Sequence, residues 1–246
     1  MSLKVVDVSK HYVVDNKNFE VVSHVSFEAQ ETEFVALIGP SGCGKSTLIR
    51  VMIGLEEASG GHVEFEGKRL VAGDGTSAMI FQHFALFPWM TTHDNIEFGL
   101  KMQGIDKAKR KKIVEDLVDE VGLSEFGEKH PKELSGGMRQ RVGIARALAI
   151  DPKLLFCDEP FSALDAFTAE TLRADLLSIW KKRKMTVVLV THLVEEAVEM
   201  ADKIVVMTPR PGKVEKVVEN KLKRPRDKRS KEFFEKVDRL LELVKV

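Results

Sequence analysis

The 246-residue sequence has no long apolar run and no excess of charge of either sign. No stretch reaches the roughly 18 apolar residues that a membrane-spanning helix needs, and the N-terminal sequence MSLKVVDVSK lacks the apolar core of a signal peptide. We therefore expect a cytoplasmic protein. Lysine plus arginine number 38, as do aspartate plus glutamate, so global charge gives no argument for nucleic-acid binding.

Cysteine is scarce as well, with only two in the chain. Cys43 lies in a glycine-rich turn and Cys157 lies in an apolar run, which is neither a disulfide framework nor the spacing of metal ligands. We expect both to be small packing residues.

The most informative stretch present is GPSGCGKST at residues 39–47. It follows an apolar run at 34–38 and precedes the sequence LIRVM at 48–52, so it reads as strand, glycine-rich turn and helix. The spacing fits the phosphate-cradling pattern G-x-x-x-x-G-K-[ST]. Its glycines let backbone N–H groups face an anion, and the helix dipole adds positive charge. A purely structural turn would give no reason for Lys-Ser-Thr at this position.

This motif predicts a nucleotide site with assigned roles. We expect Lys45 to reach the terminal phosphates, the Ser46 hydroxyl to bind magnesium and Thr47 to assist with phosphate. The residues expected to line the phosphate site are Gly39, Pro40, Ser41, Gly42, Cys43, Gly44, Lys45, Ser46 and Thr47.

Two further apolar runs end in polar residues. The run at 154–157 leads into Asp158 and Glu159, and the run at 187–190 leads into Thr191 and His192. In a parallel sheet, these ends and the phosphate turn would face one crevice. Asp158 suits a magnesium shell, and Glu159 is placed to orient or deprotonate an attacking water. An acidic turn and a structural histidine are the simpler alternatives.

Between residues 84 and 150 the apolar period changes from two to about 3.6, which predicts a mostly helical lobe. We expect one helix that is capped by Asp94 or Asn95 and runs to Met102, and a second over 107–121. The apolar segment 84–90 is either lobe core or a patch that docks a partner.

The sequence LSGGMRQR at 134–141 opens another predicted helix. Ser135 is a plausible N-cap, and Gly136 and Gly137 beside a helix start leave N–H groups that suit a second anion.

Near the N-terminus, residues 5–8 and 25–28 alternate apolar with polar and predict antiparallel strands on either side of a turn at 15–18. Tyr12, the only tyrosine, precedes this turn. Its position leaves two interpretations open, packing at a strand end or stacking on a nucleotide base.

In their order, these motifs resemble the ATP-binding subunits of ATP-binding-cassette (ABC) transporters over nearly the whole chain. LSGGMRQR is the most specific element. The resemblance implies an α/β fold, with a P-loop NTPase (RecA-like) core, an N-terminal antiparallel β-subdomain and an inserted helical subdomain. It implies a single domain over 1–246, in which 1–83 and 151–246 form the core with the β-subdomain and 84–150 form the helical subdomain with the signature motif.

The resemblance also implies roles for single residues. Gln82 would sense magnesium and the membrane partner, and magnesium would be held by Ser46, Gln82 and Asp158. Glu159 would be the general base and His192 a switch at the γ-phosphate.

Other implied roles concern the nucleotide and the second subunit. Ser135, Gly136 and Gly137 would bind the γ-phosphate of ATP held by another subunit, and Asp165 would couple the two sites. Tyr12 would stack on the base, with Phe19 as a weaker candidate.

A finer resemblance points to nitrate, sulfonate and taurine importers. It rests on four segments, at 86–89, 158–161, 208–212 and 224–227. There are two departures. Thr32 stands where glycine is usual, which affects only a turn, and Leu193 follows His192 where aspartate is usual, which concerns the local geometry after the switch.

The implied function is ATP hydrolysis that drives import of a small anion or sulfonate-like solute, with ATP and Mg²⁺ as cofactors. The implied partners are a second ATPase subunit in a homodimer, integral membrane permease subunits and, indirectly, an external solute-binding protein. No nucleic acid is expected. The protein would sit peripherally on the cytoplasmic face of the cell membrane.

Three other functions fit the sequence less well. A soluble ATPase of the same superfamily that acts on nucleic acid would need coiled-coil arms or a second cassette, and this chain has no sustained heptads and one phosphate loop. A nucleotide-binding module without hydrolysis would not need both Glu159 and His192. An exporter subunit would usually be fused to membrane helices.

Overall fold

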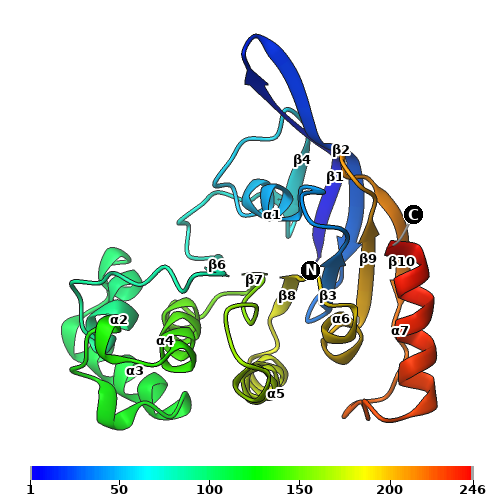
Figure 1. Cartoon of the computed structure of the whole chain (residues 1–246). Coiled ribbons are helices and arrows are strands. Elements are labelled where there is room, and N and C mark those ends of the chain that lie inside the picture. The colour runs from blue at the N-terminus through cyan, green and yellow to red at the C-terminus, as the bar shows by residue number, and fades with distance from the viewer. Residues whose placement is uncertain (1, 245–246) are drawn as a thin grey trace. The chain divides into compact units, whose positions relative to one another are not determined.

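The computed structural model describes residues 2–244, which form two compact units. Of the described residues, 2–72 and 184–244 form the first unit and 73–183 form the second (Figure 1). Besides the helices expected at 84–150, the second unit contains two strands and one long helix. No helix among the described residues is long and apolar enough to cross a membrane.

The N-terminal part of the first unit is an antiparallel sheet with the order β2-β1-β4-β5. These strands are Leu3–Val14, Lys17–Ala29, Gly60–Phe65 and Lys68–Arg69 for β1, β2, β4 and β5. The predicted short strands are therefore parts of a long hairpin, whose bulges interrupt the apolar alternation. Its two-residue turn, Asp15 and Asn16, has φ of 50° and 58°, as a tight hairpin turn requires.

The first unit also holds three neighbouring parallel strands, with β3 in the middle. They are β3 (Phe34–Ile38), β8 (Thr186–Val190) and β9 (Lys203–Met207), and every residue in them is buried, as expected for a sheet covered on both faces. The strand β10 (Val214–Glu219) pairs antiparallel with β9.

Three helices cover these strands. The helix α1 (Lys45–Met52) contacts β1, β2 and β8, and α6 (Val194–Met200) contacts β3. The C-terminal helix α7 (Lys231–Val244) packs on α6 and β9 (Figure 1).

In the second unit, β6 (Ser77–Ile80) and β7 (Leu154–Asp158) are parallel neighbours, and both are fully buried. The helices are α2 (Thr92–Met102), α3 (Lys107–Glu120), α4 (Gly136–Ala149) and α5 (Ala166–Arg183), with short 3-10 turns at Ser124–Phe126 and Pro131–Glu133. The helix α4 is central, because it packs against α2, α3, α5 and β6.

The start of α2 differs from the sequence prediction. The N-cap is Thr91, not Asp94 or Asn95. The Thr91 hydroxyl accepts from the Asp94 N–H at 3.1 Å, and the Asp94 carboxylate accepts from the Thr91 N–H at 3.4 Å, which makes a capping box. Asn95 lies inside the helix and is fully buried.

Candidate functional site

Residues 39–44 form a tight loop between β3 and α1. Gly42 and Gly44 have φ of 77° and 100°, which L side chains rarely adopt. A Cβ at Gly44 would lie 2.9 Å from the carbonyl oxygen of Val21, so this close approach to β2 needs glycine. Among the described residues, no side chain caps the start of α1. A helix start without a side-chain cap suits an anion, which the first N–H groups can bind.

Lys45 is the first residue of α1 and is only 5% exposed. Its Nζ donates to the carbonyl oxygens of Gly39, at 2.8 Å, and Pro40, at 3.1 Å. The ammonium group therefore lies across the loop. A nucleotide phosphate would offer it charged oxygens in place of neutral carbonyls, which makes a stronger hydrogen bond.

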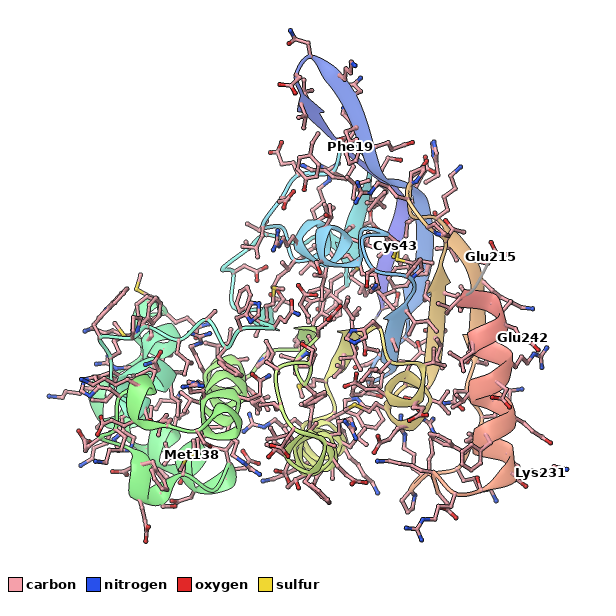
Figure 2. The ribbon with its side chains drawn as sticks, in the orientation of Figure 1. Phe19, Cys43, Met138, Glu215, Lys231 and Glu242 are labelled. Carbon is pink, nitrogen blue, oxygen red and sulfur yellow. The ribbon has the colours of Figure 1, made fainter. Side chains whose placement is uncertain are left out.

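Both cysteines are buried, as expected of packing residues. Burial raises the pKa of the Cys43 thiol, and the nearby Lys45 ammonium opposes this shift. The thiol is therefore held in its neutral form. Figure 2 shows the position of Cys43 in the phosphate loop.

Tyr12 lies in β1 directly opposite Phe19 in β2. Its hydroxyl donates to Oε2 of Glu56 at 2.5 Å, and the Lys10 ammonium lies 5.0 Å from the centre of its ring. Burial raises the pKa of Tyr12 and the bond to Glu56 raises it further, while the Thr47 side chain lowers it. Tyr12 is thus a neutral, half-buried phenol beside the helix that carries the phosphate motif.

His192 is exposed and follows β8, the parallel neighbour of β3, so it leaves the sheet at the same edge as the phosphate loop. The buried Thr191 shapes this turn. Its hydroxyl donates to the Glu196 carboxylate and accepts from the Leu193 N–H, the latter at 3.0 Å. Leu193 supplies no side-chain cap at the start of α6, so Thr191 provides the polar contacts of the turn that follows His192.

Gln82, Asp158 and Glu159 gather where the parallel strands β6 and β7 end. Gln82 Nε2 donates to Glu159 Oε2 at 3.5 Å, the outer limit of a hydrogen bond. Asp158 is 6% exposed at the last position of β7. Glu159 has φ of 44°, an uncommon backbone conformation that often marks functional positions.

The helix start at Ser135 has the expected geometry. Its hydroxyl accepts from the Met138 N–H at 3.3 Å, which confirms Ser135 as the N-cap of α4. A Cβ at Gly137 would lie 2.6 Å from Cγ2 of Thr168, whereas one at Gly136 would meet Cδ2 of Leu164 at an ordinary 3.5 Å. Gly137 is therefore required by packing, while Gly136 faces more open space.

Asp165 immediately precedes α5 and is bonded to it. Its carboxylate accepts from the Thr168 N–H at 3.0 Å and from the Thr168 hydroxyl at 2.7 Å. The Thr168 backbone N–H and then its hydroxyl lower the pKa of Asp165. Since the Thr168 methyl group lies against Gly137, this aspartate is connected to the start of α4 through one side chain.

The donors predicted for magnesium fit the ion chemically. Ser46 offers a hydroxyl, Asp158 a carboxylate and Gln82 an amide oxygen, and hard oxygens of these kinds are what Mg²⁺ prefers together with phosphate oxygens.

Two residues of the loop after β9 contact the phosphate loop, although no sequence motif predicted a site role for either. Arg210 Nε donates to the Gly42 carbonyl at 3.2 Å, and a Cβ at Gly212 would lie 2.0 Å from the Cys43 carbonyl oxygen. The sequence signal was present in the segment 208–212, where it served only as a mark of family resemblance.

Comparisons with known proteins identify the family of this chain. Residues 22–162 match the family described as "ABC transporter". An ABC transporter ATP-binding protein of Methanocaldococcus jannaschii is 42% identical over 245 residues, covering 100% of this chain and 92% of the relative. An aliphatic sulfonates import ATP-binding protein of Bacillus cereus is 43% identical over 96% of this chain and 92% of its own length. A nitrate import ATP-binding protein of Synechocystis is 38% identical over 100% of this chain and 96% of its own length.

A solved ATP-binding cassette, a dimer in a post-hydrolysis state bound to ADP and Pi, is similar in structure. Its TM-score is 0.80 at 29% identity, and the match covers 89% of this chain and 99% of that chain. The expected α/β P-loop NTPase fold is thereby confirmed, and the comparisons favour a transport ATPase over the nucleic-acid alternative. The phosphate loop, the acids at the end of β7 and the glycine-rich start of α4 thus occur in a chain that belongs to the ABC transporter family, as one of its ATP-binding, ATP-hydrolysing subunits.

Proposed function

We propose that this chain is the motor subunit of an importer for a small oxyanion of the sulfonate or nitrate class. The observation that carries the proposal is the 43% identity, over 96% of the chain, to an aliphatic sulfonates import subunit. The match to a nitrate import subunit over the full chain supports the same class of solute. The solute itself would be selected by the membrane subunit and the external binding protein.

For hydrolysis, Lys45 and the backbone N–H groups of the phosphate loop would hold the ATP phosphates. The Glu159 carboxylate would orient the attacking water and accept its proton, and the weak bond from Gln82 supports this by restraining that carboxylate. The His192 side chain would contact the γ-phosphate. Bound magnesium, with ligands from Ser46, Gln82 and Asp158, would neutralise developing phosphate charge.

The second ATPase subunit would be another copy of this chain. The chain has two helix starts suited to anions, at α1 and at α4, and both would find a role if each ATP were held between the α1 start of one copy and residues 135–137 of the other. Such head-to-tail use of two surfaces closes on itself under a two-fold axis. In this arrangement Asp165 would couple the two ATP sites of the dimer, and Tyr12 would stack on the base of the nucleotide.

The membrane partner would dock on the apolar segment 84–90. Every residue of this segment is at least partly exposed, and Trp89 is 71% exposed, which supports a docking patch over lobe core. Phe84 and Ala85 have φ of 61° and 48°, and Arg146 holds both of their carbonyl oxygens, at 3.1 and 2.6 Å. A rigid, exposed apolar patch suits a protein interface. Docking of this kind would place the chain peripherally on the cytoplasmic face of the membrane.

Co-purification from native membranes tests this function. The tagged chain is expected to recover an integral membrane protein, and the reconstituted assembly should hydrolyse ATP faster with an external binding protein loaded with an alkylsulfonate or nitrate than with the same protein unloaded. Recovery of nucleic acid in place of a membrane protein, together with ATPase activity that nucleic acid stimulates, would overturn the proposal.

A further inference from the structure

The loop between β9 and β10, residues 208–213, is built against β2. Thr208 closes the loop, because its N–H donates to the Lys213 carbonyl at 2.9 Å and its hydroxyl accepts from the Lys213 N–H at 3.0 Å. Gly212 then bonds to β2 in both directions, donating to the Val21 carbonyl at 2.9 Å and accepting from the Ser23 N–H at 3.0 Å. The loop is therefore a fixed part of the first unit.

From this position the loop touches the phosphate loop twice. Gly212 lies so close to the Cys43 carbonyl oxygen that an added Cβ would be only 2.0 Å away. The Nε of Arg210 donates to the Gly42 carbonyl at 3.2 Å. These contacts involve consecutive peptide units of the phosphate loop. The 208–213 loop therefore packs against the phosphate loop through the Arg210 side chain and the Gly212 backbone.

The same guanidinium group of Arg210 lies over the ring of Phe19, 4.7 Å from its centre. Phe19 belongs to the β1–β2 hairpin and is 44% exposed (Figure 2). A planar guanidinium on an aromatic face is held by cation–π attraction and stacking, which an ammonium group reproduces less well. One side chain thus connects the hairpin, the 208–213 loop and the phosphate loop.

We propose that Arg210 is a positioning residue for the phosphate loop, held in place by Phe19. The proposal rests on the proposed use of that loop to bind ATP. Because the peptide unit is planar, the Gly42 carbonyl and the Cys43 N–H point in opposite directions. The bond from Arg210 to this carbonyl therefore fixes the Cys43 N–H, which points into the loop and donates to the Pro40 carbonyl at 3.3 Å.

The proposal changes the role of Phe19. Sequence resemblance made it a weaker candidate for stacking on the base, but one face of its ring already carries the Arg210 guanidinium. Phe19 then acts on the phosphates through Arg210. Loss of Phe19 must consequently weaken ligands that have phosphates and no base.

The test measures Kd for a non-hydrolysable ATP analogue and for inorganic tripolyphosphate, each with magnesium. Arg210→Ala is expected to raise both Kd values about tenfold, the size of effect that corresponds to one lost charge-assisted hydrogen bond. Arg210→Lys should rescue little of this loss. Phe19→Ala should raise both Kd values by a smaller factor, and the Arg210→Ala/Phe19→Ala double variant should be no weaker than Arg210→Ala alone.

Lys213→Ala is the matched control, because Lys213 is an exposed cation of the same loop. It should bind both ligands like the parent, and all variants should melt at similar temperatures. Parental affinity in Arg210→Ala, or full rescue by Arg210→Lys, would overturn the positioning role. A Phe19→Ala variant weakened only for the ATP analogue would show that Phe19 stacks on the base. Lys45→Ala separates the two proposals, since parental affinity there would instead contradict ATP binding at this loop.

Discussion

The side chain of Asn95 holds the backbone of Phe87 from both directions. Its Oδ1 accepts from the Phe87 N–H at 2.9 Å, and its Nδ2 donates to the Phe87 carbonyl at 3.2 Å. The same Nδ2 also reaches the carbonyls of Met90, at 3.2 Å, and Thr91, at 2.9 Å. A single buried amide therefore fixes the path of the exposed apolar segment 84–90.

We expect Asn95→Ala to lower the free energy of unfolding by about 2 to 4 kcal/mol, because it leaves several backbone groups without their buried partner. Urea unfolding of the isolated chain measures this. Asn18→Ala, at an exposed position of β2, is the control and should change stability by less than about 0.5 kcal/mol. Equal effects of the two substitutions would show that the Asn95 bonds contribute little.

Docking through segment 84–90 predicts that Trp89→Ala separates assembly from stability. Because the Trp89 side chain is 71% exposed, its truncation should shift the melting temperature by less than about 2 °C and leave basal ATPase activity intact. Recovery of the membrane partner should fall strongly. Met102→Ala is a matched control, since Met102 is an equally exposed apolar residue at the end of α2, 71% by the same measure. A large loss of melting temperature in Trp89→Ala, with assembly unchanged, would contradict docking.

Substitution of Glu159 by Gln tests its role as general base. The amide keeps the shape of the side chain but accepts no proton, so hydrolysis should fall by about 100-fold or more while ATP binding is retained. ATP should then accumulate in a stable dimer, which size-exclusion chromatography detects. Near-parental hydrolysis in this variant would assign the proton transfer elsewhere. The exposed Glu195→Gln in α6 is a suitable control.

Mixing two inactive variants tests the shared ATP site. Lys45→Ala damages the phosphate loop, and Gly136→Asp adds a carboxylate at the α4 start, where 3.5 Å to Leu164 leaves room for a Cβ. If each ATP uses one motif from each copy, a mixed dimer has one site with both defects and one intact site. Hydrolysis or ATP-driven dimerisation should then exceed that of either variant alone.

Cross-linking gives an independent reading of the same arrangement. Cys43 is buried, so the exposed Ser41 is the better position for a new thiol beside the phosphate loop. With ATP present, Ser41→Cys and Ser135→Cys on separate chains should form a disulfide-linked dimer. Absence of this dimer, together with no rescue on mixing, would rule out the shared site.

The sequence by itself determined the local chemistry of the nucleotide site. The predicted strand, glycine turn and helix around residues 39–47 are present as β3, the loop and α1, and Ser135 caps α4 as expected. Such features depend on the conformational preferences of neighbouring residues and on hydrogen bonds within one turn. The helix α2 shows the limit of this reasoning. Thr91, Asp94 and Asn95 all belong to residue types that favour the N-cap position. Thr91 takes that position, whereas the Asn95 side chain is buried and hydrogen-bonds the backbone of segment 84–90.

Only the tertiary structure decided which distant groups meet. Gln82 and Glu159 are 77 residues apart, and Arg210 is 168 residues from Gly42, so no local pattern records either contact. The first pair meets because β6 and β7 are parallel neighbours, and the second because the β9–β10 loop is bonded to β2. Strand order and loop docking follow from burying all the apolar faces at once. The local sequence therefore determines which residues can bind phosphate. The contacts that hold these residues in position arise instead from packing between segments that are distant in the sequence.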